Sequence, residues 1–256
     1  MENAPALVLL HGFTNSGASW QPVISGLGER YRAIAPDIRG HASAGAAEPT
    51  LSAVIDDVAA LTPEPFALVG YSQGGRIALH VALALPHRVT RLVLIGASPG
   101  LADDAEREQR RLADERLAER IESLTIDEFA RQWAQTPILA DLPPDLAAVA
   151  HADRLQSSPQ GLAAALRNLG TGSLPSVWNR LPELRMPVTL LAGERDAKFT
   201  ALANEMARCI PRATVTVVPG AGHAVHLERP DAVVAALLAV PPDQPVTEPR
   251  TGGHAH

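Results

Sequence analysis

The feature that most constrains this chain is the run Gly70-Tyr71-Ser72-Gln73-Gly74, which lies between an apolar segment and a helical one. Phe66 to Val69 has the pattern of a buried strand, and Gly74 to Leu85 has helical periodicity that ends at Pro86. Glycines two residues before and after a serine permit a sharp, strained turn from strand to helix. The run therefore predicts that Ser72 is presented as a nucleophile at the carboxyl end of a strand.

Short apolar runs alternate with amphipathic helical stretches around this turn. Further strands are expected at Leu7–Leu10, Arg32–Pro36, Arg91–Ile95, Val188–Ala192 and Thr214–Val218, and further helices at Ser19–Glu29, Leu51–Leu61, Ala201–Ile210 and Asp231–Leu238. This alternation predicts an α/β fold with a mostly parallel, doubly wound sheet, because parallel strands need helical crossovers.

The alternation stops between residues 99 and 181, where the chain becomes helical, polar and rich in Arg, Asp and Glu, with one charged helix expected at Ala105–Glu122. Ligand sites in such sheets lie at the carboxyl edge of the strands. We therefore expect residues 1–98 and 182–240 to form the core and residues 99–181 to form an inserted helical lid over that edge. Residues 241–256, rich in Pro, Gly and Thr, are expected to be a flexible C-terminal tail.

Composition excludes several classes of function. The chain has 256 residues and a net charge of -6, without a basic block, which argues against nucleic-acid binding. No apolar stretch reaches the roughly 18 residues of a membrane span, and the N-terminus lacks the features of a signal peptide. The single cysteine, Cys209, cannot form an internal disulfide. Dispersed histidines give no metal-ligand spacing. We expect a cytoplasmic protein that binds neither membrane nor metal.

An acid and a histidine should follow the serine to complete a catalytic triad. Asp196 comes just after the strand that ends at Ala192, and Glu194 is a nearby rival. His223 follows Gly220-Ala221-Gly222 in the loop after the last expected strand. His226 and His11 are rivals for the base, but the order and the strand-end positions favour Ser72, Asp196 and His223.

Two further features follow from the turn. An oxyanion hole needs two backbone N–H groups, and the best candidates are those of Gln73, directly after the serine, and Phe13, in the loop after the first strand. Arg76 lies one helical turn beyond Ser72 on the same face. An arginine there favours an anionic substrate, because its guanidinium can bind a carboxylate through two hydrogen bonds.

Several motifs together resemble one family. They are Gly70 to Arg76, Gly96-Ala97-Ser98-Pro99-Gly100-Leu101, Glu106 to Arg111 followed by Asp114, Trp133 before Pro137, Gly170-Thr171-Gly172-Ser173, Gly193 to Phe199, and Ala221 to His226. The chain thereby resembles, from Leu9 to Pro230, the 2-succinyl-6-hydroxy-2,4-cyclohexadiene-1-carboxylate synthases of menaquinone biosynthesis, which are members of the α/β-hydrolase superfamily. The run from Asp37 to Ala42 departs from the Pro-Gly-His-Gly sequence frequent in that family.

The resemblance implies a carbon–oxygen lyase that eliminates pyruvate from 2-succinyl-5-enolpyruvyl-6-hydroxy-3-cyclohexene-1-carboxylate without water and without a cofactor. It implies that carboxylates of the substrate bind to Arg76, Arg110 and Arg154, and that Tyr71 and Trp133 line the site. The alternative arginines at helical spacing are Arg107, Arg111 and Arg167. In this interpretation Ser72 takes a proton through His223, and Asp196 holds the imidazole.

Two other functions remain open from the sequence. One is a carboxylesterase or C–C bond hydrolase that uses Ser72 as a covalent nucleophile. The other is a binding protein that has kept the fold and lost turnover. The expected partner is a small polycarboxylate, and the protein is expected to be a monomer or a homodimer.

Overall fold

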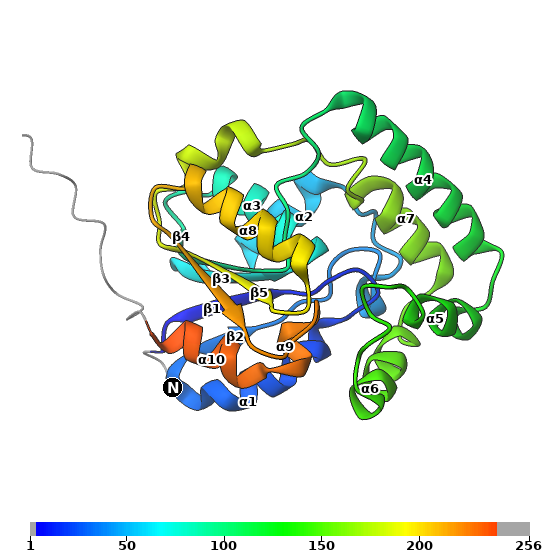
Figure 1. The fold of residues 1–256 in the computed structure, drawn as a ribbon, viewed down its shortest axis with the longest axis horizontal. Coiled ribbons are helices and arrows are strands. Elements are labelled where there is room, and N and C mark those ends of the chain that lie inside the picture. Colours follow the sequence, from blue (N-terminus) through cyan, green and yellow to red (C-terminus); the bar gives the residue numbers. More distant parts are fainter. Residues whose placement is uncertain (1–3, 240–256) are drawn as a thin grey trace, which may run out of the picture.

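A six-stranded sheet with the order β2-β1-β3-β4-β5-β6 forms the centre of the molecule (Figure 1). The computed structural model describes residues 4–239. The strands are β1 (Ala6–Leu10), β2 (Arg32–Ile34), β3 (Phe66–Tyr71), β4 (Val89–Ile95), β5 (Val188–Gly193) and β6 (Ala213–Val218). Every neighbouring pair is parallel. The predicted α/β class is confirmed, and the sheet in the described residues is parallel throughout.

Alternate residues of the strands face two helical layers, as the two-residue period of a strand requires. Leu7 and Leu9 belong to the apolar cluster that includes α1 (Gln21–Leu27) and α10 (Pro230–Leu238). Their neighbour Val8 belongs to the opposite cluster, which is packed against the other face. That layer contains α2 (Leu51–Ala60), α3 (Gln73–Ala84) and α8 (Ala197–Cys209). The helices of both layers flank the sheet in Figure 1.

Four α-helices lie between β4 and β5, grouped to one side of the sheet in Figure 1. They are α4 (Asp104–Glu122), α5 (Ile126–Ala134), α6 (Pro144–Arg154) and α7 (Pro159–Leu169). An apolar cluster of their own includes Ile121, Phe129 and Leu162. This segment covers the helical part of the predicted lid.

Asp114 joins α4 to the loop that follows α7. Its buried carboxylate accepts a hydrogen bond from Arg110 Nε at 2.7 Å and another from the Gly172 backbone N–H at 3.2 Å. A buried carboxylate is stable only when its oxygens have such partners. The contacts explain why a charged residue lies on the buried face of α4, beside Ala118 and Ile121.

Some element boundaries differ from the sequence predictions. Helix α8 begins at Ala197 instead of Ala201, because the Asp196 side chain accepts a hydrogen bond from the Phe199 N–H at 3.3 Å and caps the helix. A short helix not predicted from sequence, α9 (Val225–Glu228), follows His223 directly. Residues 241–256, the predicted tail, lie outside the described residues. No helix in residues 4–239 is long and apolar enough to cross a membrane.

Three buried histidines make the fold sensitive to acid. Burial lowers the pKa of His41 and of His226 to about 3, and that of His80 to about 4. Between these values and the ordinary value near 6.5, the unfolded chain binds protons that the folded chain does not. The free energy of unfolding should therefore fall on acidification from about pH 6.5, by about 1.4 kcal/mol per pH unit for each histidine.

The variant His226→Phe tests this expectation. Both imidazole nitrogens of His226 lack a hydrogen-bond partner within the described residues, and the ring lies against Trp20 and Tyr71, so an aromatic replacement keeps the stacking. Urea unfolding at pH 7 and pH 5 should show a smaller loss of stability on acidification than in the parent protein. His87→Asn, at an exposed position, is the control. An unchanged pH dependence for His226→Phe would contradict the expectation.

Candidate active site

Ser72 occupies a left-handed backbone conformation between β3 and α3, with φ 51° and ψ -110°. The flanking glycines make this turn possible. A Cβ on Gly70 would lie 2.4 Å from the Gly74 carbonyl oxygen, and one on Gly74 would lie 2.3 Å from the Leu10 carbonyl oxygen. Strain of this kind persists only where surrounding structure enforces it. The turn places the Ser72 hydroxyl at the N-terminus of α3, where the helix dipole favours negative charge.

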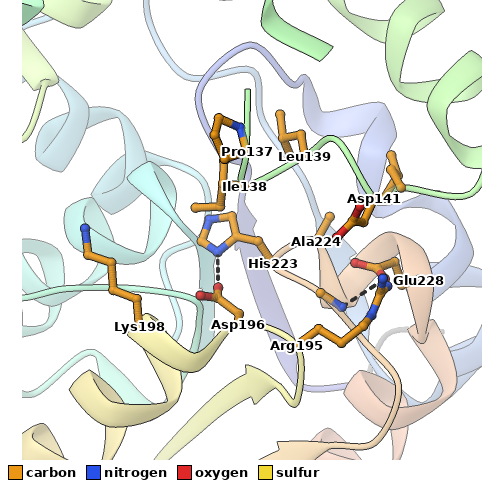
Figure 2. Close-up of a pocket in the computed structure, with 12 residues that line it drawn as sticks. Pro137, Ile138, Leu139, Asp141, Arg195, Asp196, Lys198, His223, Ala224 and Glu228 are labelled. Atoms are coloured by element: carbon orange, nitrogen blue, oxygen red, sulfur yellow. Dashed lines mark hydrogen bonds and ion pairs between the residues drawn. The ribbon is translucent and has the colours of Figure 1, made fainter. Parts of the chain in front are cut away.

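A chain of hydrogen bonds joins Ser72 to His223 and Asp196. The Ser72 Oγ lies 3.1 Å from His223 Nε2, and His223 Nδ1 lies 2.6 Å from Asp196 Oδ2. The side chains of His223 and Asp196 are only 4% and 8% exposed, and Figure 2 shows them facing each other. This geometry allows the imidazole to take a proton from the serine while the carboxylate fixes its orientation.

Three residues confine the His223 imidazole. The rings of Phe199 and Tyr71 lie 4.6 and 5.3 Å from it, centroid to centroid. Gly96 has φ 53°, and a Cβ there would lie 2.7 Å from His223 Cε1. The roles of Phe199 and Gly96 could not be predicted from the sequence, because nothing in the local pattern shows that β4 ends against the histidine loop.

The rival acid and bases have other contacts. Glu194 accepts a hydrogen bond from the Gly220 N–H at 2.9 Å. His226 is buried between aromatic rings and lacks hydrogen-bond partners in residues 4–239. His11 is buried and hydrogen-bonded to the backbone on both sides of its ring. None of the three forms a bond with Ser72 in the described structure.

His11 holds the peptide group that carries the candidate oxyanion donor Phe13. The Ile38 N–H donates to His11 Nε2 at 2.9 Å, so Nδ1 carries the proton and donates to the Gly12 carbonyl at 2.9 Å. The Gly12 carbonyl and the Phe13 N–H belong to one peptide plane and point in opposite directions. Within residues 4–239 the backbone N–H groups of Phe13 and Gln73 have no hydrogen-bond partner, so both are free to bind an anion.

The Arg76 side chain is buried and forms no ion pair or hydrogen bond within the described residues, and its Nε is shielded from solvent without a partner. Burial, and then the nearby charge of Arg110, lower the pKa of Arg76 to about 10, so the guanidinium stays charged at neutral pH. An unpaired buried cation is costly. Together with the half-exposed Arg110, which Asp114 orients, it forms a positive region one helical turn from Ser72.

The other predicted binding residues lie around the loop after β1. Arg154, on α6, is 3% exposed, and its Nε donates to Thr14 Oγ1 at 3.3 Å. Burial raises the pKa of the Tyr71 phenol, with Arg154 opposing the shift, so Tyr71 is a neutral hydrogen-bond donor at neutral pH. The Trp133 ring lies 5.3 Å from that of Phe13.

The rival arginines Arg107, Arg111 and Arg167 are engaged in ion pairs. Arg107 pairs with Asp104, Arg111 with Glu108, and Arg167 with both Glu115 and Glu122. The three rival arginines therefore have a structural role, because their ion pairs stabilise the helices. Arg76 and Arg154, in contrast, form no ion pair with a carboxylate within residues 4–239.

A cavity of 410 Å³ borders the acid and base of the triad on their outer side. Figure 2 shows its apolar wall, which includes Ile138 and Leu139, above the His223 imidazole, and Lys198 on the other side of Asp196. Ser72 and the predicted binding residues are not among the residues that line it. The cavity therefore borders His223 and Asp196 without including the Ser72 hydroxyl or the predicted binding residues.

Comparison with known proteins identifies the family. A family model described as the alpha/beta hydrolase fold matches residues 5–230. A relative from Salmonella schwarzengrund (strain CVM19633), named 2-succinyl-6-hydroxy-2,4-cyclohexadiene-1-carboxylate synthase, is 36% identical over 93% of this chain and 94% of its own length. A relative from Bacillus subtilis (strain 168), provisionally given the same name, is 36% identical over 88% of this chain and 86% of its own. The chain belongs to the 2-succinyl-6-hydroxy-2,4-cyclohexadiene-1-carboxylate synthase family of the α/β-hydrolase fold.

A solved structure from the same synthase family agrees. The structure of MenH from S. aureus superimposes with a TM-score of 0.87 at 31% identity, covering 92% of each chain. The resemblance inferred from the sequence motifs is confirmed for the family and for the fold. The roles of individual residues of this chain stay predictions.

The variant Gly96→Ala should disturb the triad of this synthase-family chain. The added methyl collides with the His223 ring, so the imidazole must leave the position in which it bonds Ser72 and Asp196. The rate at which a fluorophosphonate labels Ser72 should fall about 10-fold or more, because misplacement of a catalytic group by about 1 Å has large effects.

Gly28→Ala is the matched control for this variant. Gly28 also has a left-handed conformation, with φ 58°, but a Cβ there meets nothing within 4 Å. It should lose about 1 kcal/mol of stability and label normally. Equal labelling rates for Gly96→Ala and Gly28→Ala would show that His223 does not depend on the space at Gly96.

Proposed function

We propose that the protein eliminates pyruvate from 2-succinyl-5-enolpyruvyl-6-hydroxy-3-cyclohexene-1-carboxylate to give 2-succinyl-6-hydroxy-2,4-cyclohexadiene-1-carboxylate, in menaquinone biosynthesis. The observation that carries this proposal is the buried, unpaired guanidinium of Arg76 beside a hydrogen-bonded Ser–His–Asp triad. A neutral ester gains nothing from such a cation, whereas a polycarboxylate supplies the missing partner. The names of the relatives support the same reaction.

In the proposed reaction Ser72 relays a proton from the substrate ring to His223. The ring C–H bond breaks, its electron pair forms the new double bond, and the C–O bond to the enolpyruvyl group breaks. The leaving enolate takes up one proton and becomes pyruvate, so no water or cofactor is consumed. Asp196 stabilises the imidazolium that forms transiently. The amides of Phe13 and Gln73 bind the negative charge that develops on the substrate.

The helices α4–α7 act in this proposal as a lid that completes the binding site. Arg110 comes from α4, Trp133 from α5 and Arg154 from α6, while Arg76 comes from the core helix α3. A trianionic substrate would therefore contact both parts of the chain. Its charges would favour the arrangement in which the positive side chains converge.

We also infer the setting of the reaction. The acidic chain is expected to act in the cytoplasm on a small polycarboxylate, without nucleic acid or membrane as a partner, as a monomer or a homodimer.

The arginine variants test substrate recognition. Arg76→Met and Arg110→Met should each lower kcat/KM for pyruvate release by roughly 10- to 100-fold, the range expected for hydrogen bonds to a charged group. Arg111→Met, which removes an exposed arginine paired with Glu108, is the control and should be nearly neutral. Pyruvate is followed with lactate dehydrogenase, alongside the absorbance of the conjugated diene.

Stability separates binding from structure in the same variants. Arg76→Met should raise the melting temperature, because it removes a buried unpaired charge. Arg110→Met should lower it, because Asp114 loses its cation. Unchanged kcat/KM in both variants would contradict the role proposed for the arginines.

The role of Ser72 distinguishes the lyase from a hydrolase. During turnover of the cyclohexene substrate, intact-mass spectrometry should show no adduct on the protein, and Ser72→Ala should lose most of the pyruvate-forming activity. A covalent intermediate on Ser72 that accumulates in a burst would instead indicate nucleophilic catalysis.

A further inference from the structure

The backbone directly before the triad base is held by one buried carboxylate. Glu228, on the short helix α9, has a side chain that is 6% exposed. Its Oε2 accepts a hydrogen bond from the N–H of Gly222 at 2.9 Å, and Gly222 is the residue directly before His223. A Cβ on Gly222 would lie 3.0 Å from Glu228 Oε1, so the loop and the carboxylate are in close contact.

The same oxygen of Glu228 forms an ion pair with Arg195, which lies in the loop that carries the triad acid. Arg195 Nη2 lies 2.5 Å from Glu228 Oε2, and Arg195 Nε donates to the Gly220 carbonyl at 3.1 Å. The Arg195 backbone N–H donates to the Ala221 carbonyl at 2.9 Å. Arg195 is the residue directly before Asp196. Glu228 therefore joins two residues: Arg195, before the acid, through an ion pair, and Gly222, before the base, through a hydrogen bond.

We propose that Glu228, together with Arg195, is a positioning residue that sets the separation and orientation of Asp196 and His223. The proposal rests on the lyase function for its kinetic readout only. Within residues 4–239 neither side chain has a hydrogen bond or ion pair with a predicted substrate-binding residue, and their bonds go to the loops that carry Asp196 and His223. We therefore expect their effect on catalysis to pass through the imidazole. Figure 2 shows Arg195 and Glu228 reaching toward each other on the side of His223 away from Lys198.

A purely stabilising ion pair is the competing explanation. Arg195 is 41% exposed and Glu228 is almost fully covered, so removal of the carboxylate leaves a buried N–H at Gly222 without its acceptor. Loss of stability alone therefore decides nothing. The two explanations differ in kcat, in the coupling to His223, and in the state of the imidazole.

The decisive variants are Glu228→Ala and Glu228→Gln, with Asp231→Asn as the matched control. Asp231, which lies three residues after Glu228, is an exposed carboxylate that is paired with Arg229. Glutamine keeps an oxygen that can accept from Gly222 but loses the charge that binds Arg195. We expect kcat for pyruvate release to fall about 10- to 100-fold in Glu228→Ala and less in Glu228→Gln, with KM within about twofold. Asp231→Asn should match the parent.

A double-mutant cycle shows whether the effect passes through His223. In a His223→Ala background, Glu228→Ala or Glu228→Gln should cause no further loss of the residual activity, because the group that Glu228 positions is gone. A further loss of the same size as in the parent would overturn the proposal, as would an unchanged kcat in the single variants.

Proton NMR tests the positioning without any substrate. The imidazole Nδ1–H that is bonded to Asp196 should give a far-downfield resonance, assigned by its absence in His223→Ala. This resonance should shift or broaden in Glu228→Gln and stay in place in Asp231→Asn. If the parent protein releases no pyruvate, the lyase proposal fails and the NMR result still decides the role of Glu228; an unperturbed resonance would overturn it. Glu228→Gln also settles the question where Glu228→Ala does not fold.

Discussion

The left-handed backbone at Ser72 is the constraint on which the active site depends. A non-glycine residue at φ 51° is strained, and this strain is sustained by the packing of α3 against β1 and β3. Because Gly70 and Gly74 lack a Cβ, the backbone at the start of α3 packs directly against the backbone at the ends of β3 and β1, without intervening side chains. The buried strands then fix the direction of α3. As a result the serine hydroxyl, the free Gln73 amide and the Arg76 guanidinium all lie within the first turn of one rigid helix.

Two buried charges near this turn differ in whether they have partners. Asp114 is fully satisfied by Arg110 and Gly172, as a buried carboxylate in a stable fold should be. Arg76 is the opposite case, because its buried guanidinium has no partner in the described residues. Burial lowers the pKa of the neighbouring His80, and the charge of Arg76 lowers it further. Such a charge costs stability unless a bound anion pairs with it. Its presence beside Ser72 therefore argues for an anionic ligand more strongly than its position in the sequence does.

Sequence patterns were sufficient for the sheet, for the turn at Ser72 and for the order of the triad residues, because each depends on local periodicity or on residues at strand ends. They were also sufficient for the family, since the matching motifs are spread along the chain. They could not show that Gly96 makes room for the His223 ring, or that Glu228 binds the loop before it. Those contacts join segments far apart in the sequence. Likewise, Arg154 differs from Arg107, Arg111 and Arg167 only in what the fold places beside it.

The predicted anion-binding residues and the oxyanion loop form one mechanical unit. Asp153, at the end of α6, accepts hydrogen bonds from the Asn15 side chain at 3.2 Å and from the Ser16 N–H at 3.0 Å. The next residue, Arg154, binds Thr14, which has φ 69°. Two adjacent residues of α6 thus fix the segment that directly follows Phe13.

The opposite end of that segment is fixed by His11 through the Gly12 carbonyl. The Phe13 amide is therefore held between an anchor in the core and an anchor on α6. Displacement of α6 by an ångström would break the bonds to Asp153 and change the direction of the amide. We therefore expect a carboxylate bound at Arg154 to change the position of Phe13, the candidate oxyanion donor, because α6 is bonded to the segment that follows it. Such a coupling would give the buried polar contacts between α6 and the loop after β1 a role in the proposed reaction.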